Sequence, residues 1–316
     1  MIVDYRFEQA SGLSAESFYT IGVRFDEEYD HRDEQESWCV HVTPTVMSIS
    51  NGYHACNTGI YTAPDGQVFI CDGSGAVFRN LDPSVNPAAW VTDALDASLE
   101  GIWGLSSDYV LTWGGPDPKM FLWNGSTWSP MPHPGGWIRE IRGTSADCLY
   151  AVGHKGLCFR WDGRRWNQVP CPNNALISVV VLDNDQVFAS DTLGDLLVGS
   201  SRGMSKLLHF DETIASMTWW KGELWLGTGL GLGKLVDGKV EILKENIGAY
   251  SLDGRGDLII GTCDYAVCST DGETFAGYSV QDFGKQRVGY GPLWNPGADI
   301  LIDHGDPDGY DHYGEP

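Results

Sequence analysis

The sequence is poor in basic residues and contains no long apolar run. Lysine and arginine together number 20, against 43 aspartates and glutamates, which gives a formal net charge of −23 over 316 residues. Binding to nucleic acid depends on contacts of lysine and arginine with phosphates, so we expect none. No run of about eighteen apolar residues is present, which predicts no membrane span. Charges at Asp4, Arg6 and Glu8 interrupt any signal-peptide core, so we expect a soluble, cytoplasmic protein.

Patterns of common catalytic and metal sites are also missing. The eight cysteines form no Cys-x-x-Cys pair, so zinc is not expected. Reduced, buried thiols are expected in the cytoplasm, although Cys263 and Cys268 flank one predicted hairpin and are the pair best placed for a disulfide. No phosphate-binding Walker loop and no Gly-x-Ser-x-Gly nucleophile elbow occurs. We therefore predict no cofactor, no metal, no catalytic residue and no enzymatic activity.

Glycine and tryptophan, in contrast, are abundant, at 40 and 13 residues. A turn residue, a variable residue and a short apolar or β-branched run recur together, at starts that lie 34 to 42 residues apart. Further apolar stretches flank most copies, and Asn-Gly or Asp-Gly turns follow four of them, as two-residue hairpins require. Four short strands in a unit of about 40 residues are typical of a propeller blade. The copies begin at Gly66, Asp108, Asp147, Asp185, Gly222, Gly256 and Ala298.

The sequence thus predicts an all-β, seven-bladed β-propeller with four-stranded antiparallel blades, as one domain over residues 1–316. The seventh repeat supplies only two strands, because the residues after His304 form a poor strand. N-terminal strands complete this last blade: residues 18–43 and 287–304 are expected to form the closing blade, and 305–316 an acidic tail. Closure removes two exposed sheet edges. Two alternatives stay open: residues 1–45 could form a separate cap, and 87–99 could be a short helix.

One repeat carries a recognisable pattern, which runs from Asp147 to the segment Trp161-Asp-Gly-Arg-Arg-Trp166. It resembles bacterial propeller repeats of the form D-x-W-A-V-G…W-D-G-x-x-W, and the copy from Asp108 to Trp128 is similar. Residues 269–275, Ser-Thr-Asp-Gly-Glu-Thr-Phe, resemble the Asp-box of sialidase-type repeats but are one residue short. The resemblance covers residues 57–280 and implies the propeller fold. Because such families include enzymes, lectins and scaffolds, it implies no particular function.

The resemblance also implies that the loops joining the second and third strands of each blade share one rim at the mouth of the channel. Five carboxylates fall in these loops, and one further loop holds His154 and Lys155. Four tryptophans lie near the ends of inner strands and could serve as aromatic anchors. Alternatively, the aspartates only make turns and the tryptophans pack between blades. The candidate binding residues are Asp72, Asp117, Asp191, Asp264, Asp303, Trp113, Trp137, His154, Trp219 and Trp220.

We expect this acidic rim to bind a basic protein partner, with the chain acting as a non-catalytic inhibitor or immunity protein that neutralises a toxin domain. A carbohydrate-binding or degenerate sialidase-like propeller is the alternative, and a structural scaffold is a third. A sialidase needs an arginine cluster, which only Arg139, Glu140 and Arg142 approach. Strand alternation would turn Arg139 or Glu140 toward the channel but not all three, so a structural ion pair is expected. Solubility or a halophilic host would also explain the acidity.

Overall fold

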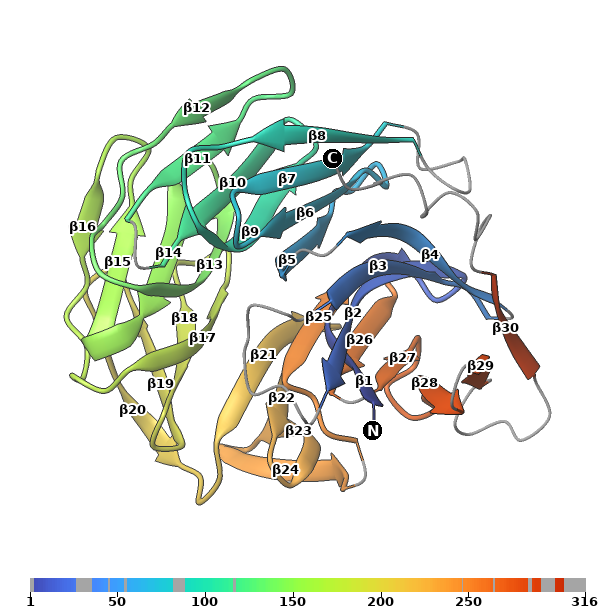
Figure 1. The fold of residues 1–316 in the computed structure, drawn as a ribbon. Helices are drawn as coiled ribbons and strands as arrows, with labels where there is room; N and C mark the ends of the chain where they lie inside the picture. Colours follow the sequence, from blue (N-terminus) through green and yellow to red (C-terminus); the bar gives the residue numbers. More distant parts are fainter. Residues whose placement is uncertain are drawn as a thin grey trace.

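The structure is a computed structural model that describes residues 3–26, 36–44, 46–53, 56–81, 89–115, 118–245, 247–263, 265–283, 286–290 and 299–303. Within these ranges the chain folds into β-strands, apart from one 3₁₀ turn at His154–Gly156. None of their helical segments is long and apolar enough to cross a membrane. The sheets are arranged around a central axis (Figure 1). The predicted seven-bladed β-propeller with four-stranded antiparallel blades is confirmed.

Five blades follow one another along the chain as separate four-stranded sheets. Consecutive strands pair, and the first strand of each blade contacts the first strand of the next, so first strands are innermost. The first two of these blades are β5 (Asn57–Thr62), β6 (Val68–Asp72), β7 (Ala76–Asn80) and β8 (Trp90–Ala94), then β9 (Leu99–Ser106), β10 (Tyr109–Gly114), β11 (Met120–Trp123) and β12 (Trp128–Pro130).

The next three blades repeat this order. They are β13 (Ile138–Ser145), β14 (Cys148–Gly153), β15 (Leu157–Trp161) and β16 (Trp166–Gln168), then β17 (Leu176–Val181), β18 (Val187–Asp191), β19 (Asp195–Ser200) and β20 (Gly203–His209), then β21 (Ile214–Trp220), β22 (Glu223–Thr228), β23 (Gly231–Val236) and β24 (Lys239–Lys244).

The last two blades belong to one ten-stranded sheet. The sixth blade is β25 (Ser251–Arg255), β26 (Leu258–Thr262), β27 (Ala266–Ser269) and β28 (Ala276–Phe283). The seventh is β1 (Val3–Ser14), β2 (Ser17–Asp26), β3 (Glu36–Val42) and β4 (Val46–Tyr53), with β1 in contact with both β25 and β5. The remaining strands are β29 (Gln286–Tyr290), which pairs with β28, and β30 (Asp299–Asp303), which pairs in parallel with β4.

The closing blade differs from its expected composition. N-terminal strands do complete the ring, but they supply all four strands of the seventh blade, and the two C-terminal strands attach to outer edges. The sequence pattern missed β1, in which Val3, Tyr5 and Phe7 alternate with charged residues. Alternation of apolar and charged residues is typical of a strand with one buried face. The charged residues of this segment were used only to exclude a signal peptide, so the strand was not predicted from the sequence.

Apolar runs form strands here because neighbouring blades cover both faces of each sheet. The second strands β6, β18 and β26 are buried at every residue. On one side of the closing blade Ile21 packs with Ile60, and on the other side Phe18 packs with Ile260. The seventh blade therefore has a hydrophobic core on each face, which makes it part of the ring and not a separate cap.

A polar cluster also joins the two ends of the chain. Arg255 on β25 donates to both carboxylate oxygens of Asp253, from Nε at 2.9 Å and Nη2 at 2.5 Å, and to the carbonyl oxygen of Thr62 on β5. Ser11 on β1 receives a hydrogen bond from Nη2 of Arg255 at 2.5 Å and donates to Asp253 at 3.1 Å. The backbone N–H of Thr62 donates to the same Ser11 hydroxyl at 2.8 Å. These residues, the closure cluster, connect blades six, seven and one.

Two smaller alternatives are also decided. The stretch 87–99 contributes the strand β8 (Trp90–Ala94) and not a helix in its described part. All eight cysteines carry free thiols, including Cys263 and Cys268.

Candidate functional site

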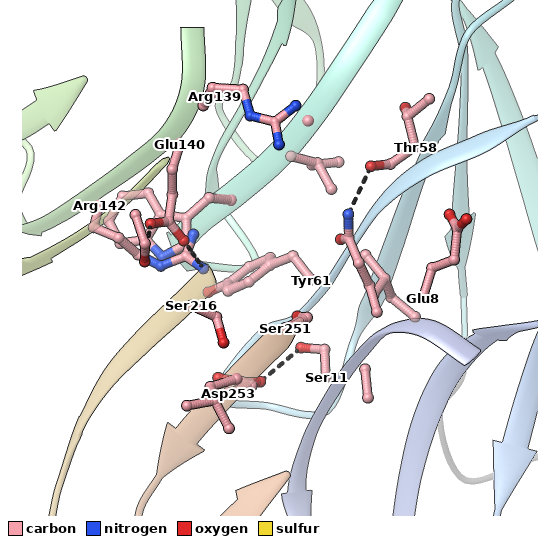
Figure 2. Close-up of a pocket in the computed structure, with 18 of the residues that line it drawn as sticks. Glu8, Ser11, Thr58, Tyr61, Arg139, Glu140, Arg142, Ser216, Ser251 and Asp253 are labelled. Atoms are coloured by element: carbon pink, nitrogen blue, oxygen red, sulfur yellow. Dashed lines mark hydrogen bonds and ion pairs between the residues drawn. The ribbon is translucent and has the colours of Figure 1, made fainter. Parts of the chain in front are cut away.

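The inner strands of all seven blades enclose a central cavity of about 730 Å³ (Figure 2). Hydrogen bonds between neighbouring inner strands show that the strands run in the same direction. Near their first residues, Thr58 donates to the carbonyl of Leu99 at 3.0 Å, and near their last residues the closure cluster joins Ser11 to Thr62. We call the mouth where the inner strands begin the proximal end, and the mouth where they finish the distal end.

At the proximal end, seven equivalent side chains form one ring. In five inner strands the pairing register shifts at the second residue, and in the longer β1 it shifts at Glu8, between Phe7 and Gln9; such a shift is the signature of a β-bulge. Tyr250 holds the equivalent place just before β25. A bulge adds one residue to a strand, so the side chains at the bulge no longer alternate regularly between the two faces of the sheet. All seven residues line the cavity. This proximal ring consists of Glu8, Thr58, Glu100, Arg139, Ile177, Ala215 and Tyr250.

The bulge corrects the expectation for Arg139, Glu140 and Arg142. All three line the cavity, because the register shift between Ile138 and Glu140 gives the strand an extra residue at Arg139. The expected structural ion pair exists: Arg142 Nη2 lies 2.7 Å from Glu140 Oε1. The other carboxylate oxygen of Glu140 accepts hydrogen bonds from Ser178 Oγ at 2.8 Å and from the backbone N–H of Val179 at 2.6 Å.

Arg139 itself is exposed and has no hydrogen-bond or ion-pair partner among the described residues. Its guanidinium group extends from β13 toward the side of the cavity where Thr58 lies, away from the Glu140–Arg142 pair (Figure 2). Three other arginines line the same cavity: Arg142 and Arg255 are paired with carboxylates, and Arg6 also has an interaction partner. Arg139 is therefore a cation that lines the cavity and forms no hydrogen bond or ion pair with the described residues.

The predicted acidic rim is wrong at the two aspartates whose side chains are described. Asp72 and Asp191 are 1% and 0% exposed. Asp72 Oδ1 accepts the backbone N–H of Ser74 at 3.0 Å, and Asp191 Oδ1 that of Leu193 at 2.9 Å, so each stabilises its own turn. Asp117 and Asp264 lie outside the described residues. Asp303 is the last residue of β30, and its side chain is likewise outside the described part.

Of the four tryptophans predicted as aromatic anchors, two are exposed, one near each end of the channel, and two are buried. Trp137 is 38% exposed at the proximal end and stacks on His154 with ring centroids 4.9 Å apart. Trp219 is 39% exposed near the distal end of β21. The prediction is wrong for Trp113 and Trp220, which are 2% and 3% exposed and pack between blades.

The exposed carboxylates that sequence reasoning missed lie at the distal end. Each of the seven turns between a first and a second strand carries one, or has one at its edge, and all are exposed. Because each turn follows an inner strand, the turns surround the distal mouth. The only basic residue in these described turns is Lys221, which lies 3.7 Å from Asp257. This distal acidic ring consists of Glu16, Asp65, Asp108, Asp147, Asp183, Glu223 and Asp257.

No model of a known protein family matches the sequence, and no curated protein matches it either. Solved structures do match. Virginiamycin B lyase from Staphylococcus aureus superposes with a TM-score of 0.62 at 11% identity, over 83% of this chain and 96% of that one. YCF48 bound to D1 peptide superposes with a TM-score of 0.61 at 11% identity, over 82% and 89%. A structure of U3-55K superposes with a TM-score of 0.59 at 10% identity, over 82% and 90%.

Identities this low show a shared fold and nothing more. Because one of these similar structures is a lyase, the expectation that the chain is not an enzyme is corrected: its fold gives no ground for excluding catalysis. Another similar structure holds a peptide, so the fold is also compatible with binding a protein partner.

Proposed function

We propose that this propeller binds a basic surface of a partner protein with its distal acidic ring. The observation that supports it is the recurrence of an exposed carboxylate in all seven turns around one mouth of the channel. Aspartate is a common turn residue, but turn formation alone does not require an acid in every blade. At Asp65 and Asp147, for example, asparagine could accept the same hydrogen bonds, from Gln67 N–H and from Ser145 Oγ.

Electrostatics favours a partner rich in lysine and arginine. Among the described residues, Glu223 pairs with Lys234 at 2.6 Å and Asp257 lies 3.7 Å from Lys221, whereas the other five carboxylates of the ring have no ion-pair partner there. These five carboxylates around one opening repel one another, and the chain as a whole carries a formal net charge of −23. A basic surface relieves this repulsion and is attracted from a distance, so association is fast at low salt and slower as ionic strength rises. The structure of YCF48 with D1 peptide is a precedent for a polypeptide ligand on a similar fold.

The narrower form of this proposal makes the partner a toxin domain that the chain neutralises. A neutraliser must cover the basic surface with which the toxin meets its own target, and an acidic ring suits that task. Co-expression of the chain with a candidate toxin, scored by cell survival, tests this form separately from binding itself.

The binding proposal is tested with a pair of matched variants. The distal variant, Asp65→Asn/Asp108→Asn/Asp147→Asn, removes three charges from neighbouring turns. The control, Asp96→Asn/Asp211→Asn/Glu212→Gln, removes three exposed charges from loops between blades at the proximal end. Each exposed ion pair contributes about 0.2–1 kcal/mol, so the loss of three should weaken binding by about threefold to 150-fold.

Each immobilised protein is used to capture partners from lysate at low salt, and the affinity of the captured partner is then measured. The proposal is supported if one partner is retained by wild type and control, is released by salt and is lost by the distal variant. It is overturned if the distal variant keeps the partner, if salt does not release it, or if nothing is captured at low salt.

A further inference from the structure

We infer that the proximal ring is a binding site for an organic carboxylate attached to an apolar body, and that Arg139 is its anion-binding group. The site lies at the opposite end of the channel from the distal acidic ring, so it is independent of the proposed partner surface. Its ligand is small enough to enter the cavity, whose volume of about 730 Å³ falls in the range of small-molecule sites.

The first observation is the unpaired arginine. Arg139 reaches the cavity because of the bulge in β13, and it has no partner among the described residues. The contact between β13 and β17 is made instead by Glu140, which pairs with Arg142 and accepts hydrogen bonds from Ser178 and Val179. Bulges often redirect side chains at functional sites. A planar guanidinium group binds a carboxylate with two parallel hydrogen bonds.

The second observation is the order of side chains around the proximal ring. Following the blades, Glu8, Thr58, Glu100 and Arg139 form a polar arc, and Ile177, Ala215 and Tyr250 form an apolar arc. Arg139 stands at the boundary, next to Ile177 in the adjacent blade. Tyr250 completes the apolar arc and is 66% exposed. A ligand whose carboxylate meets Arg139 can therefore lay an apolar body over Ile177, Ala215 and the ring of Tyr250.

The charges of the ring favour a carboxylate over a phosphate. Glu8 and Glu100 line the same cavity as Arg139. A doubly charged phosphate beside these two carboxylates would be repelled more strongly than a singly charged carboxylate. A single guanidinium group can balance one negative charge, which matches the carboxylate.

Two sources can supply this chemistry: a free organic acid, or the C-terminal residue of a peptide with an apolar side chain. The probes are N-acetyl-phenylalanine and a short peptide that ends in phenylalanine, each compared with its own carboxamide. Binding is followed by NMR titration of the full-length chain. We expect each carboxylate to bind at least about tenfold more tightly than its amide, because a hydrogen-bonded charge pair is formed only with the acid.

The variants are Arg139→Gln, Arg139→Lys and the control Arg164→Gln, which removes the same charge from an exposed distal turn. We expect Arg139→Gln to lose the preference for acid over amide, Arg139→Lys to keep part of it, and Arg164→Gln to keep all of it. Tighter binding of the free acid identifies a metabolite-type ligand, and tighter binding of the peptide identifies a chain terminus. The inference is overturned if wild type shows no preference for either acid, or if Arg139→Gln and Arg139→Lys both keep it in full.

Discussion

The closure cluster makes a quantitative prediction about the stability of the ring. Asp253→Ala leaves the Arg255 guanidinium without its carboxylate, in a setting where the two side chains are only 22% and 27% exposed. It also removes the acceptor of Ser11 Oγ and of the Gly12 N–H. Burial lowers the pKa of Arg255, and the Asp253 carboxylate more than offsets burial, so the substitution removes the main contact that stabilises the buried charge. The guanidinium group nevertheless stays charged, because arginine is not deprotonated in proteins.

The expected cost follows from these contacts. A hydrogen bond to a charged group contributes about 1.5–3 kcal/mol net, and breaking a fully buried ion pair costs about 3–5 kcal/mol. Because the cluster is partly exposed, we expect a loss below the second range, at about 2–3 kcal/mol. Unfolding entropy of about 2.1 cal/mol/K per residue gives roughly 0.7 kcal/mol/K for a chain of 316 residues. Asp253→Ala should therefore lower Tm by about 3–5 °C.

Differential scanning calorimetry is the assay, and Asp257→Ala is the matched control. Asp257 lies in the next turn, is 94% exposed and is 3.7 Å from Lys221, so its loss should change Tm by less than about 1 °C. The double variant Asp253→Ala/Arg255→Met should be less destabilised than Asp253→Ala, because no unpaired charge remains. The reasoning is refuted if Asp253→Ala has the same Tm as Asp257→Ala, or if the double variant has the lowest Tm of the three.

Two further predictions concern thiol chemistry and titration. Burial raises the pKa of Cys71 to about 12, and Cys39 is equally buried, whereas Cys56 is exposed. Iodoacetamide at neutral pH should therefore label Cys56 in the native protein and the other two only in denaturant, as followed by mass spectrometry; early labelling of Cys71 would contradict the packing. The N–H of Arg165, the amide of Asn167 and the N–H of Arg164 lower the pKa of Asp162 to about 2. Its folded-state pKa is below the ordinary value, so this stabilisation is present above about pH 4 and is lost as pH falls through 2; carboxyl NMR should show titration near pH 2 in wild type and a higher pKa in Asn167→Ala.

The sequence repeat predicted the architecture because one physical pattern recurs in every blade. A turn residue followed by apolar residues marks each second strand, and the structure places β14 (Cys148–Gly153) and β26 (Leu258–Thr262) within one or two residues of the predicted segments. The closing blade was harder to predict because its inner strand β1 mixes aromatic and charged residues. That strand gains its stability from blades far away in sequence, through contacts such as Ser11 with Asp253.

Two aspartates of the predicted acidic rim are buried, because aspartate has two roles in these turns. In Asp72-Gly-Ser-Gly75 and Asp191-Thr-Leu-Gly194 the carboxylate is buried and accepts backbone N–H groups of the turn, while the final glycine takes a positive φ of 97° or 84°. That spacing of aspartate and glycine is a sequence signal for a buried turn aspartate. Asp108 and Asp147, which begin two of the repeats, are exposed, and the sequence pattern marks them only as turn residues.

The proximal ring could not be predicted from alternation, because alternation describes a regular strand and the ring depends on bulges. A bulge is a property of a strand pair: it needs two residues to face one across the ladder, as between Ile138–Glu140 and Val152–Gly153. Once the register shift is known, equivalent positions in seven blades can be compared directly, and Arg139 stands out as the only arginine among them.

Because the same inner strands begin at the proximal ring and end at the distal acidic ring, substitutions at one end leave the other end's turns and pairings in place. The two proposed sites should therefore lose binding separately, which a chain with one shared site would not do.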